Sequence, residues 1–237
     1  MPQSDPFANS QNVLITGGSS GIGKSCVERF VKSNYQVATV DRQEAQLPEE
    51  VIFVKADLSQ KESIAKIQAA LKEADFQPDI LILNAGKGIH QSLTEGDPDE
   101  WEYIFQLNVL STLRMIRAFV PAMAEKGQGD VFFVTSVSAR HPYPYGGVYA
   151  ATKAALEVIA ETLRLEQQPH IRVSRILPGV VDTAFFNEMI DGQQTPESIG
   201  WGALSPDKVA QTIFEAVNQP HEVALNEIVI RPVAQPM

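Results

Sequence analysis

The feature that most constrains this chain is an alternation of short β-rich runs with longer segments of helical periodicity. The runs at residues 12–16 (NVLIT), 79–83 (DILIL) and 130–135 (DVFFVT) are almost continuously apolar, which is typical of strands buried on both faces of a sheet. Strand–helix–strand repetition favours parallel pairing with right-handed crossovers. The sequence therefore predicts an α/β fold, a doubly wound parallel seven-stranded sheet of Rossmann type with helices on both faces. Strands are expected at 12–16, 36–40, 51–54, 79–83, 130–135, 171–177 and 227–230, and helices at 22–33, 61–74, 99–125, 148–167 and 207–218.

The same pattern indicates a single domain over residues 12–237, preceded by a flexible polar arm at 1–11. A chain of 237 residues suits one α/β domain, and neither a repeat nor a Pro/Gly-rich linker divides it. The one long irregular segment, 180–205, is rich in Gly, Pro, Gln and aromatic residues. A loop of this length in a compact domain is usually functional, so we expect it to form a substrate loop.

The charge and the cysteine content indicate which partners the protein can bind and in which compartment it is expected. The chain has 29 Asp plus Glu against 19 Lys plus Arg, a formal net charge of -10, and this excess disfavours binding to nucleic acid or to an anionic membrane. Cys26 is the single cysteine and cannot form an internal disulfide. No run approaches the ~20 apolar residues of a membrane span, and the first dozen residues lack the layout of a signal peptide. We therefore expect a cytoplasmic protein.

A glycine-rich turn joins the first expected strand to the first expected helix. Glycines at 17, 21 and 23 allow a tight turn, a close approach of the backbone to a pyrophosphate, and close helix–sheet packing. The helix that follows directs its N-terminal amides toward the anion. A plain glycine-rich connection is the alternative, but the strand–turn–helix context favours a dinucleotide site.

Asp41 follows the second strand, 20 residues beyond Gly21. A carboxylate at this place accepts hydrogen bonds from the ribose hydroxyls of NAD and repels the 2′-phosphate of NADP. Arg42 could instead clamp that phosphate, stack on the adenine or face solvent. Asp41 favours NAD, and Arg42 leaves NADP as the alternative.

Further motifs follow in a fixed order along the chain. They are Asp57-Leu58, Asn84-Ala85-Gly86, Asn108, Ser136, Tyr149 with Lys153, Pro178-Gly179 and Thr183. Together with the glycine turn, they give the chain beyond its N-terminal arm a resemblance to the short-chain dehydrogenase/reductase family. The run at 227–235 resembles a hydroxy-acid dehydrogenase branch of that family that favours NADP, which opposes the NAD prediction from Asp41.

The spacing of Tyr149 and Lys153 suits proton transfer. Residues four apart share one face of a helix, about 6 Å apart along its axis. A free tyrosine has a pKa near ~10, and a neighbouring ammonium favours the phenolate. Tyr149 could then exchange a proton with an alcohol or carbonyl, while the Ser136 hydroxyl orients the same substrate oxygen. Taken alone, each of these residues would be an ordinary surface, strand-end or capping residue, so their joint occurrence carries the prediction.

The resemblance implies the remaining roles. Lys153 would also bind the nicotinamide ribose, and Asn108 would maintain a water-linked proton path to it. Asp57 would reach the adenine amine and Leu58 would line its pocket, although Asp57 could simply cap the next helix. The implied dinucleotide-binding residues are Gly17, Ser19, Ser20, Gly21, Ile22, Gly23, Asp41, Arg42, Asp57, Leu58, Asn84, Ala85, Gly86, Tyr149, Lys153, Pro178, Gly179, Val181 and Thr183.

The substrate is expected to be a small carbonyl compound or secondary alcohol. Arg140 is the residue we expect to grip an acid group on it, with an exposed surface arginine as the alternative; His90 could contact it or be an ordinary loop histidine. The expected substrate wall is Ile89, His90, Arg140, Tyr143, Tyr145, Phe185, Phe186, Met189 and Trp201.

Two helices, 99–125 and 148–167, carry apolar residues on more than one side. One face covers the sheet and the other needs a partner, so a homodimer or homotetramer is expected, as in the family. No Cys/His cluster has zinc spacing, so no metal is required. The predicted activity is a hydride-transferring oxidoreductase. The alternatives are a dinucleotide-sensing binding protein without turnover, and an epimerase or dehydratase on the same scaffold.

Overall fold

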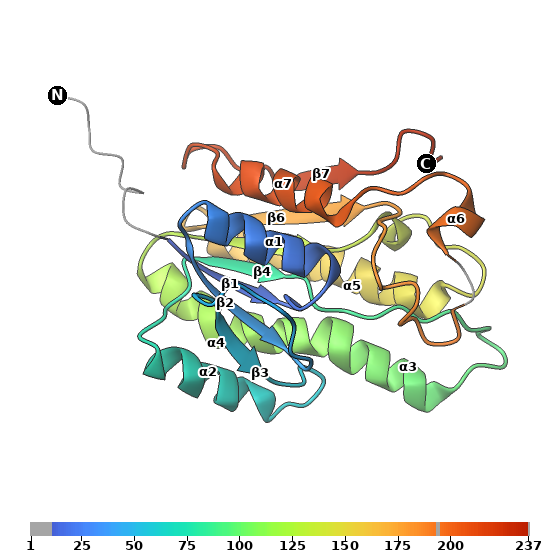
Figure 1. Cartoon of the computed structure of the whole chain (residues 1–237), viewed down its shortest axis with the longest axis horizontal. Coiled ribbons are helices and arrows are strands. Elements are labelled where there is room, and N and C mark those ends of the chain that lie inside the picture. Colours follow the sequence, from blue (N-terminus) through green and yellow to red (C-terminus); the bar gives the residue numbers. More distant parts are fainter. Residues whose placement is uncertain (1–10, 193–194, 237) are drawn as a thin grey trace.

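The computed structural model, which describes residues 11–192 and 195–236, contains a seven-stranded sheet in the order β3-β2-β1-β4-β5-β6-β7. Every neighbouring pair of strands is parallel, which confirms the predicted fold (Figure 1). The predicted arm, residue 11 apart, lies outside the described residues. The strands are β1 (Asn12–Thr16), β2 (Gln36–Asp41), β3 (Ile52–Lys55), β4 (Ile80–Leu83), β5 (Gly129–Val134), β6 (Ile171–Pro178) and β7 (Glu227–Ile230).

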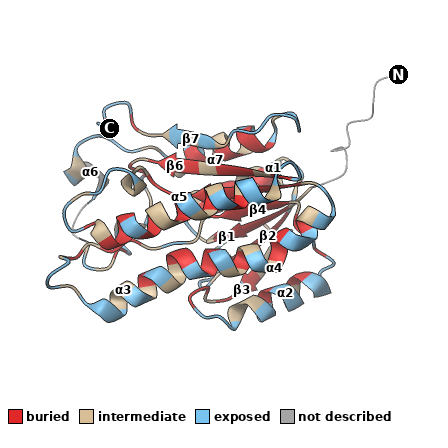
Figure 2. Cartoon of the chain, turned by 180° about the vertical axis from the view of Figure 1, so that it is seen from behind, coloured by how far each residue is buried: buried red, intermediate tan, exposed pale blue. Residues whose placement is uncertain are grey.

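Helices cover both faces of the sheet. Helices α1 (Gly21–Lys32) and α7 (Pro206–Val217) pack together on one face, and α2 (Ser63–Glu73), α4 (Ser111–Glu125) and α5 (Gly147–Gln167) cover the other (Figures 1 and 2). β4 and β5 are buried along their whole length, as their apolar runs predict, whereas the edge strand β7 is only half-buried.

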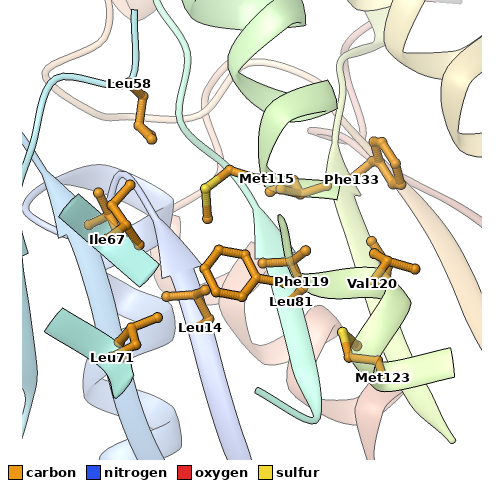
Figure 3. Close-up of a cluster of buried hydrophobic side chains, with 14 of the residues drawn as sticks. Leu14, Leu58, Ile67, Leu71, Leu81, Met115, Phe119, Val120, Met123 and Phe133 are labelled. Carbon is orange, nitrogen blue, oxygen red and sulfur yellow. The ribbon is translucent and has the colours of Figure 1, made fainter. Parts of the chain in front are cut away.

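The core beneath α2 and α4 shows how the sheet and helices interlock. Leu14 and Leu81 of the sheet face Met115 and Phe119 of α4, with Ile67 of α2 beside them (Figure 3). All of these side chains are buried. This apolar layer holds the strands in register, and that register fixes where their carboxyl ends lie.

The long helix expected at 99–125 is interrupted. It consists of α3 (Pro98–Phe105), a π-helical turn η1 (Gln106–Leu110) and α4. The hydroxyls of Ser111 and Thr112 donate to the carbonyls of Leu107 and Asn108, which gives these carbonyls partners beside the widened turn. π-turns inside helices are frequent at functional sites, and this one carries Asn108.

The predicted loop 180–205 holds more structure than its composition indicates. It contains the short helix α6 (Pro196–Ile199), and isolated β-bridges tie Val181 to Leu204 and Ile190 to Ile89. A one-turn helix, η2 (Val137–Ala139), follows β5. Within residues 11–192 and 195–236, no helix is long and apolar enough to cross a membrane.

A cleft of about 740 Å³ runs along the carboxyl ends of the strands. Each of the seven strands contributes to its lining, through Gly17, Asp41, Ala56, Asn84, Thr135, Gly179 and Arg231. In open parallel sheets, ligands bind at this edge, where the strand order reverses. Here the order reverses between β1 and β4, so the fold itself points to the cleft as the functional site.

Candidate active site

The glycine turn lies at one end of the cleft and has no room for side chains. Gly17 and Gly21 have φ values of 74° and 51°, in the region that glycine adopts without strain. A Cβ on Gly23 would lie 2.0 Å from the carbonyl oxygen of Gly17. Ser20, at the N-cap of α1, makes no side-chain capping bond, and the first turn of α1 contains no acidic residue. The amides of that turn are therefore available to an anion in the cleft.

Asp41 closes the far side of this turn. Its carboxylate accepts hydrogen bonds from the amides of Ser19 (3.1 Å) and Gln43 (3.2 Å), so its oxygens are held in a fixed place on the cleft wall. Arg42 is exposed, and its guanidinium lies 3.5 Å from the Tyr103 hydroxyl. Both Asp41 and Arg42 line the cleft, and the protein's own contacts fix the carboxylate far more firmly than the guanidinium.

Asn84 and Asp57, two of the predicted dinucleotide-binding residues, form hydrogen bonds within the protein. The Asn84 amide donates to the carbonyls of Thr16 (3.1 Å) and Gly17 (3.2 Å), which holds the glycine turn against β4. Asp57 accepts from both the amide and the hydroxyl of Ser59, so it caps a turn that precedes α2 and is not the cap of the helix itself, which begins at Ser63. Both residues still line the cleft. The other predicted dinucleotide residues that line it are Ser19, Ser20, Gly21, Ile22, Leu58, Gly86, Tyr149, Lys153, Pro178, Val181 and Thr183, whereas Gly23 and Ala85 are not part of the lining.

Ser136, Tyr149 and Lys153 meet at the middle of the cleft. Ser136 follows β5, and its hydroxyl lies near enough to the Tyr149 phenol to favour the phenolate. Tyr149 and Lys153 lie one turn apart on α5, and the lysine Nζ is 5.7 Å from the centroid of the tyrosine ring. Lys153 donates to the carbonyl of Val134 at 3.0 Å. The structure thus brings the predicted proton-transfer residues together at the sheet edge.

Burial dominates the electrostatics of this group. It raises the pKa of Tyr149 above its ordinary value, and the nearby Ser136 hydroxyl only partly opposes this. Burial also lowers the pKa of Lys153 to about 8. The Lys153 ammonium does not overcome the burial of the phenol, so the low tyrosine pKa expected from their spacing is not produced by these two side chains alone.

Asn108 lies behind the cleft, fully buried in the π-turn. Its amide group accepts from the Lys87 amide (2.9 Å) and donates to the Lys87 carbonyl (3.0 Å) and the Thr152 hydroxyl (3.1 Å). A Cβ on Gly86 would lie 3.2 Å from the Asn108 oxygen and 3.5 Å from Lys153 Nζ. Asn108 therefore fastens the chain after β4 to α5 and faces the lysine across Gly86.

The predicted substrate wall is partly assembled. Tyr143, Phe185 and Trp201 line the cleft, as do Phe186 and Met189. The rings of Phe185 and Tyr149 are 5.5 Å apart. His90 does not line the cleft; its ring lies beside Tyr143 and Tyr145, and its Nε2 is buried without a hydrogen-bond partner among the described residues. Ile89 and Tyr145 also lie outside the lining.

Arg140 is the clearest departure from the expected wall. Its guanidinium bonds Glu227 of β7 at 2.8 and 2.5 Å and Glu157 of α5 at 2.7 Å, and it does not line the cleft. The expectation that it grips a substrate acid group is wrong for this arrangement, because two carboxylates already occupy it. The alternative of a surface arginine is closer to what the structure shows.

Sequence patterns missed several residues that line the cleft. Lys87 directly follows the recognised Asn84-Ala85-Gly86 motif, and that position after a strand could have suggested it. Arg231 and Gln235 come from the chain after β7. The side-chain oxygen of Gln235 accepts from the Val180 amide at 2.9 Å, so this C-terminal segment supports the start of the substrate loop. No local sequence motif predicts the contact between Gln235 and Val180.

No group of three or more His, Cys, Asp or Glu side chains within the described ranges could hold a metal ion. Cys26 is buried in α1, and burial raises the pKa of its thiol to about 12. The cleft presents backbone amides and the carboxylates of Asp41 and Asp57 at its dinucleotide end, and the Ser136, Tyr149 and Lys153 side chains at its middle.

Comparisons with known proteins agree with this geometry. The family model for short chain dehydrogenase matches residues 11–194. An uncharacterized oxidoreductase of Staphylococcus saprophyticus is 31% identical, over 93% of this chain and 96% of the relative. Among solved structures, a closed form of serine dehydrogenase complexed with NADP+ superposes with a TM-score of 0.89 at 27% identity, covering 96% of this chain and 97% of the other. A 3-ketoacyl-(acyl-carrier-protein) reductase from Brucella melitensis complexed with NADH gives 0.83 at 27% identity, covering 94% and 98%.

Proposed function

The chain is an oxidoreductase that belongs to the short chain dehydrogenase family, and from that premise we propose that it interconverts a small carbonyl compound and its alcohol, with Tyr149 as the acid–base group. The observation that carries the proposal is the meeting of Ser136, Tyr149 and Lys153 in the same cleft as the glycine turn. Proton transfer and dinucleotide binding would then occur within reach of each other.

The cleft fits a nicotinamide dinucleotide. The glycine turn forms a cradle that any Cβ would fill, and the uncapped first turn of α1 suits a pyrophosphate. Gly17, Ser20, Gly21 and Ile22 would hold the phosphates, Asp41 the adenosine ribose, and Lys153 the nicotinamide ribose. Val181 and Thr183 would hold the carboxamide. When bound, this group supplies the hydride donor or acceptor.

Tyr149 and Ser136 would act on the substrate oxygen. In the reducing direction, the Tyr149 phenol donates its proton to the carbonyl oxygen as that oxygen gains negative charge; in the oxidising direction, the phenolate accepts the alcohol proton. The Ser136 hydroxyl, which already lies near the phenol, orients the substrate oxygen and stabilises its charge.

Lys153 would stabilise the phenolate that remains after proton donation. Its ammonium lies 5.7 Å from the centre of the Tyr149 ring, buried away from water that would screen it. Asn108 holds Lys87 and Thr152 on either side of this region, so we assign to it the support of a proton path that ends at Lys153.

We propose NAD as the preferred dinucleotide. Asp41 lies on the cleft wall with its carboxylate fixed by the Ser19 and Gln43 amides, and it retains lone pairs for the ribose hydroxyls. An NADP phosphate at this place would meet a fixed negative charge. Arg42 supports NADP less strongly, because its guanidinium is held in place by a long hydrogen bond to the Tyr103 hydroxyl, at 3.5 Å.

The substrate end favours a compact molecule. Tyr143, Phe185, Met189 and Trp201 form an aromatic and apolar wall beside Tyr149. Since Arg140 is engaged elsewhere, an acid group on the substrate would have to be recognised by Lys87 or Arg231, whose side chains line the cleft. The two solved neighbours act, by their names, on serine and on a 3-ketoacyl group, and short 3-oxo and 3-hydroxy compounds are accordingly the substrate class to test first.

The test is a spectrophotometric screen of NADH and NADPH oxidation over short ketones, aldehydes and 3-oxo esters, and of NAD and NADP reduction over 3-hydroxy acids and serine. We expect turnover with at least one compound and a preference for NAD. Tight dinucleotide binding without turnover across the panel would instead identify a dinucleotide sensor. Activity that consumes no dinucleotide would identify an epimerase or dehydratase.

We also propose a two-fold dimer formed by a second copy of this chain. Phe105 and Leu113 of the α3–α4 helix and Val158 and Leu165 of α5 are large apolar side chains that remain 40% or more exposed, and both helices lie on the same face of the molecule (Figure 2). Covering them would bury apolar surface. A monomer in analytical ultracentrifugation at micromolar concentration would contradict the dimer.

A further inference from the structure

Gln91, eight residues after β4, is a buried side chain that does not line the cleft. Its Nε2 donates to the carboxylates of Glu100 (2.5 Å) and Asp191 (2.6 Å). Its Oε1 accepts from the indole of Trp101 (2.8 Å) and from the amide of Asp97 (3.2 Å). The carboxamide thus uses both of its donors and both of its acceptor positions.

This set of partners specifies a neutral amide. Two carboxylates need a donor, and an indole N–H and a backbone N–H need an acceptor, so the group fits in one orientation. A glutamate at position 91 would set a third carboxylate against Glu100 and Asp191. Gly96 packs so closely that a Cβ there would lie 2.8 Å from the Gln91 oxygen. The surrounding chain is shaped around this side chain.

The partners of Gln91 lie on three separate segments that surround the substrate end. These are the chain from β4 to α3, the chain from β5 to α5, and residues 180–192 after β6. The backbone N–H of Gln91, which does not depend on the side chain, adds a bond to the carbonyl of Tyr145 at 2.8 Å, four residues before Tyr149. Tyr145 and Asp191 both have positive φ values, 66° and 52°, which residues with side chains hold only where the surroundings fix them. Gln91 bonds both.

The bonds of Gln91 are continued by backbone pairing that reaches the catalytic tyrosine. Ile190 pairs with the chain at Ile89, and the His90 amide donates to the Ile190 carbonyl at 3.0 Å. The same segment carries Phe185, whose ring lies 5.5 Å from that of Tyr149. A Cβ on Gly88 would lie 2.7 Å from the tip of the Phe185 ring. Phe185 is therefore clamped between Gly88 and Tyr149.

We propose that Gln91 is a positioning residue that sets the width of the substrate end, by fastening residues 184–192 to the start of α3 so that Phe185 stays against Tyr149. This rests on the proposed function, since it assigns to Gln91 the selectivity of the same site. Gln91 touches neither substrate nor dinucleotide. Its loss widens the pocket and leaves the proton-transfer residues in place.

The experiment compares Gln91→Ala and Gln91→Glu with the wild type and with Gln68→Ala, a matched control on the exposed face of α2. Asp191→Ala removes one arm of the network, and Asp191→Asn restores an acceptor oxygen; this pair keeps the test available if the Gln91 variants do not fold. Each protein is assayed with ethyl acetoacetate and with the bulkier ethyl benzoylacetate. Deuterium uptake by the peptide spanning 184–192 and the Kd for NADH are measured on the same samples.

For Gln91→Ala we expect faster deuterium uptake at 184–192. The KM for ethyl acetoacetate should rise about tenfold, with kcat changed less than about threefold. The ratio of kcat/KM for ethyl acetoacetate to that for ethyl benzoylacetate should fall about fivefold. The Kd for NADH should stay within about twofold of the wild type. Asp191→Ala should show a smaller effect of the same kind, and Asp191→Asn and Gln68→Ala little change.

Unchanged deuterium uptake in Gln91→Ala would overturn the proposal, and so would faster uptake with unchanged selectivity in an active enzyme. Uptake needs no turnover. If neither ester reacts with any variant while uptake rises, the fastening by Gln91 stands and the proposed function is what fails.

Discussion

The two ends of the cleft are built in different ways. At the dinucleotide end, the phosphate-binding turn comes from residues close together in the chain, and its shape is set by backbone: Gly17, Gly21 and the first turn of α1. At the substrate end, the Gln91 side chain joins segments that lie far apart in sequence, the start of α3 and the chain after β6. The turn is built from local backbone, whereas the substrate end depends on a contact that spans 100 residues between Gln91 and Asp191.

This difference teaches where selectivity can change without loss of the fold. The backbone turn tolerates few substitutions, because a Cβ at Gly23 would collide with the Gly17 carbonyl and Gly17 and Gly21 have positive φ values. Side-chain bonds between loops can be altered one at a time, so the substrate end can be retuned while the dinucleotide end stays constant. Tyr149 and Lys153 lie where the two ends meet.

The largest effect is expected at that junction. Tyr149→Phe removes the phenol hydroxyl and keeps the ring that packs against Phe185, so kcat should fall about 10³-fold, within the range of general acid–base catalysis. Calorimetry should find the Kd for NADH nearly unchanged. A fall in NADH affinity as large as the fall in kcat would mean that the two ends are not separable.

The next largest effect is expected on the preference for NAD over NADP. Asp41→Asn keeps the size of the side chain and removes its charge, which should weaken NAD binding by about 2 kcal/mol, or about 30-fold, and improve the use of NADP. The ratio of kcat/KM for the two dinucleotides measures this, and the preference between ethyl acetoacetate and ethyl benzoylacetate is the internal control. An unaltered NAD preference would place the discrimination elsewhere, with Arg42 the first candidate.

A pH effect of about tenfold per unit is expected in the reducing direction. Burial lowers the pKa of Lys153 to about 8, so below that pH the ammonium is present to stabilise the phenolate that forms when Tyr149 gives up its proton. Above it the ammonium is lost, and kcat/KM for ketone reduction should fall. Lys153→Arg, if active, should lose this inflection, since arginine stays charged. A flat profile between pH 7 and 9 in the wild type would remove Lys153 from this role.

The smallest effect on activity is expected from Arg140→Ala. The guanidinium bonds Glu157 and Glu227 outside the cleft, so KM should stay within about twofold for both esters. The side chain is 41% exposed and water screens its charge, but its loss leaves the Glu157 carboxylate without its nearest cation. Urea denaturation should show a loss of about 1 kcal/mol. A KM for 3-hydroxy acids raised tenfold or more would restore Arg140 to the substrate site.

The features that could be predicted from the sequence are those set by local patterns, and the features that were missed depend on contacts between distant segments. The parallel seven-stranded sheet and the glycine turn could be predicted because strand periodicity and glycine spacing are local signals. The π-turn at Asn108 could not, because a widened turn leaves no mark in the apolar periodicity of 99–125. Arg140 was misplaced, because its position four residues after Ser136 says nothing about Glu227, 87 residues away. Gln91, Arg231 and Gln235 were missed for the same reason: their roles come from tertiary contacts.

The central claim is that Tyr149 can be made acidic enough to exchange a proton at neutral pH. The most direct measurement is the ultraviolet difference spectrum between the wild type and Tyr149→Phe, titrated with pH in the presence and absence of saturating NAD. Because burial raises the pKa of Tyr149, we predict that its phenolate appears only above the ordinary ~10 without NAD, and below it once bound NAD adds the positive charge of its nicotinamide. A phenolate that titrates at the same pH in both samples, or never below ~10, would contradict the account.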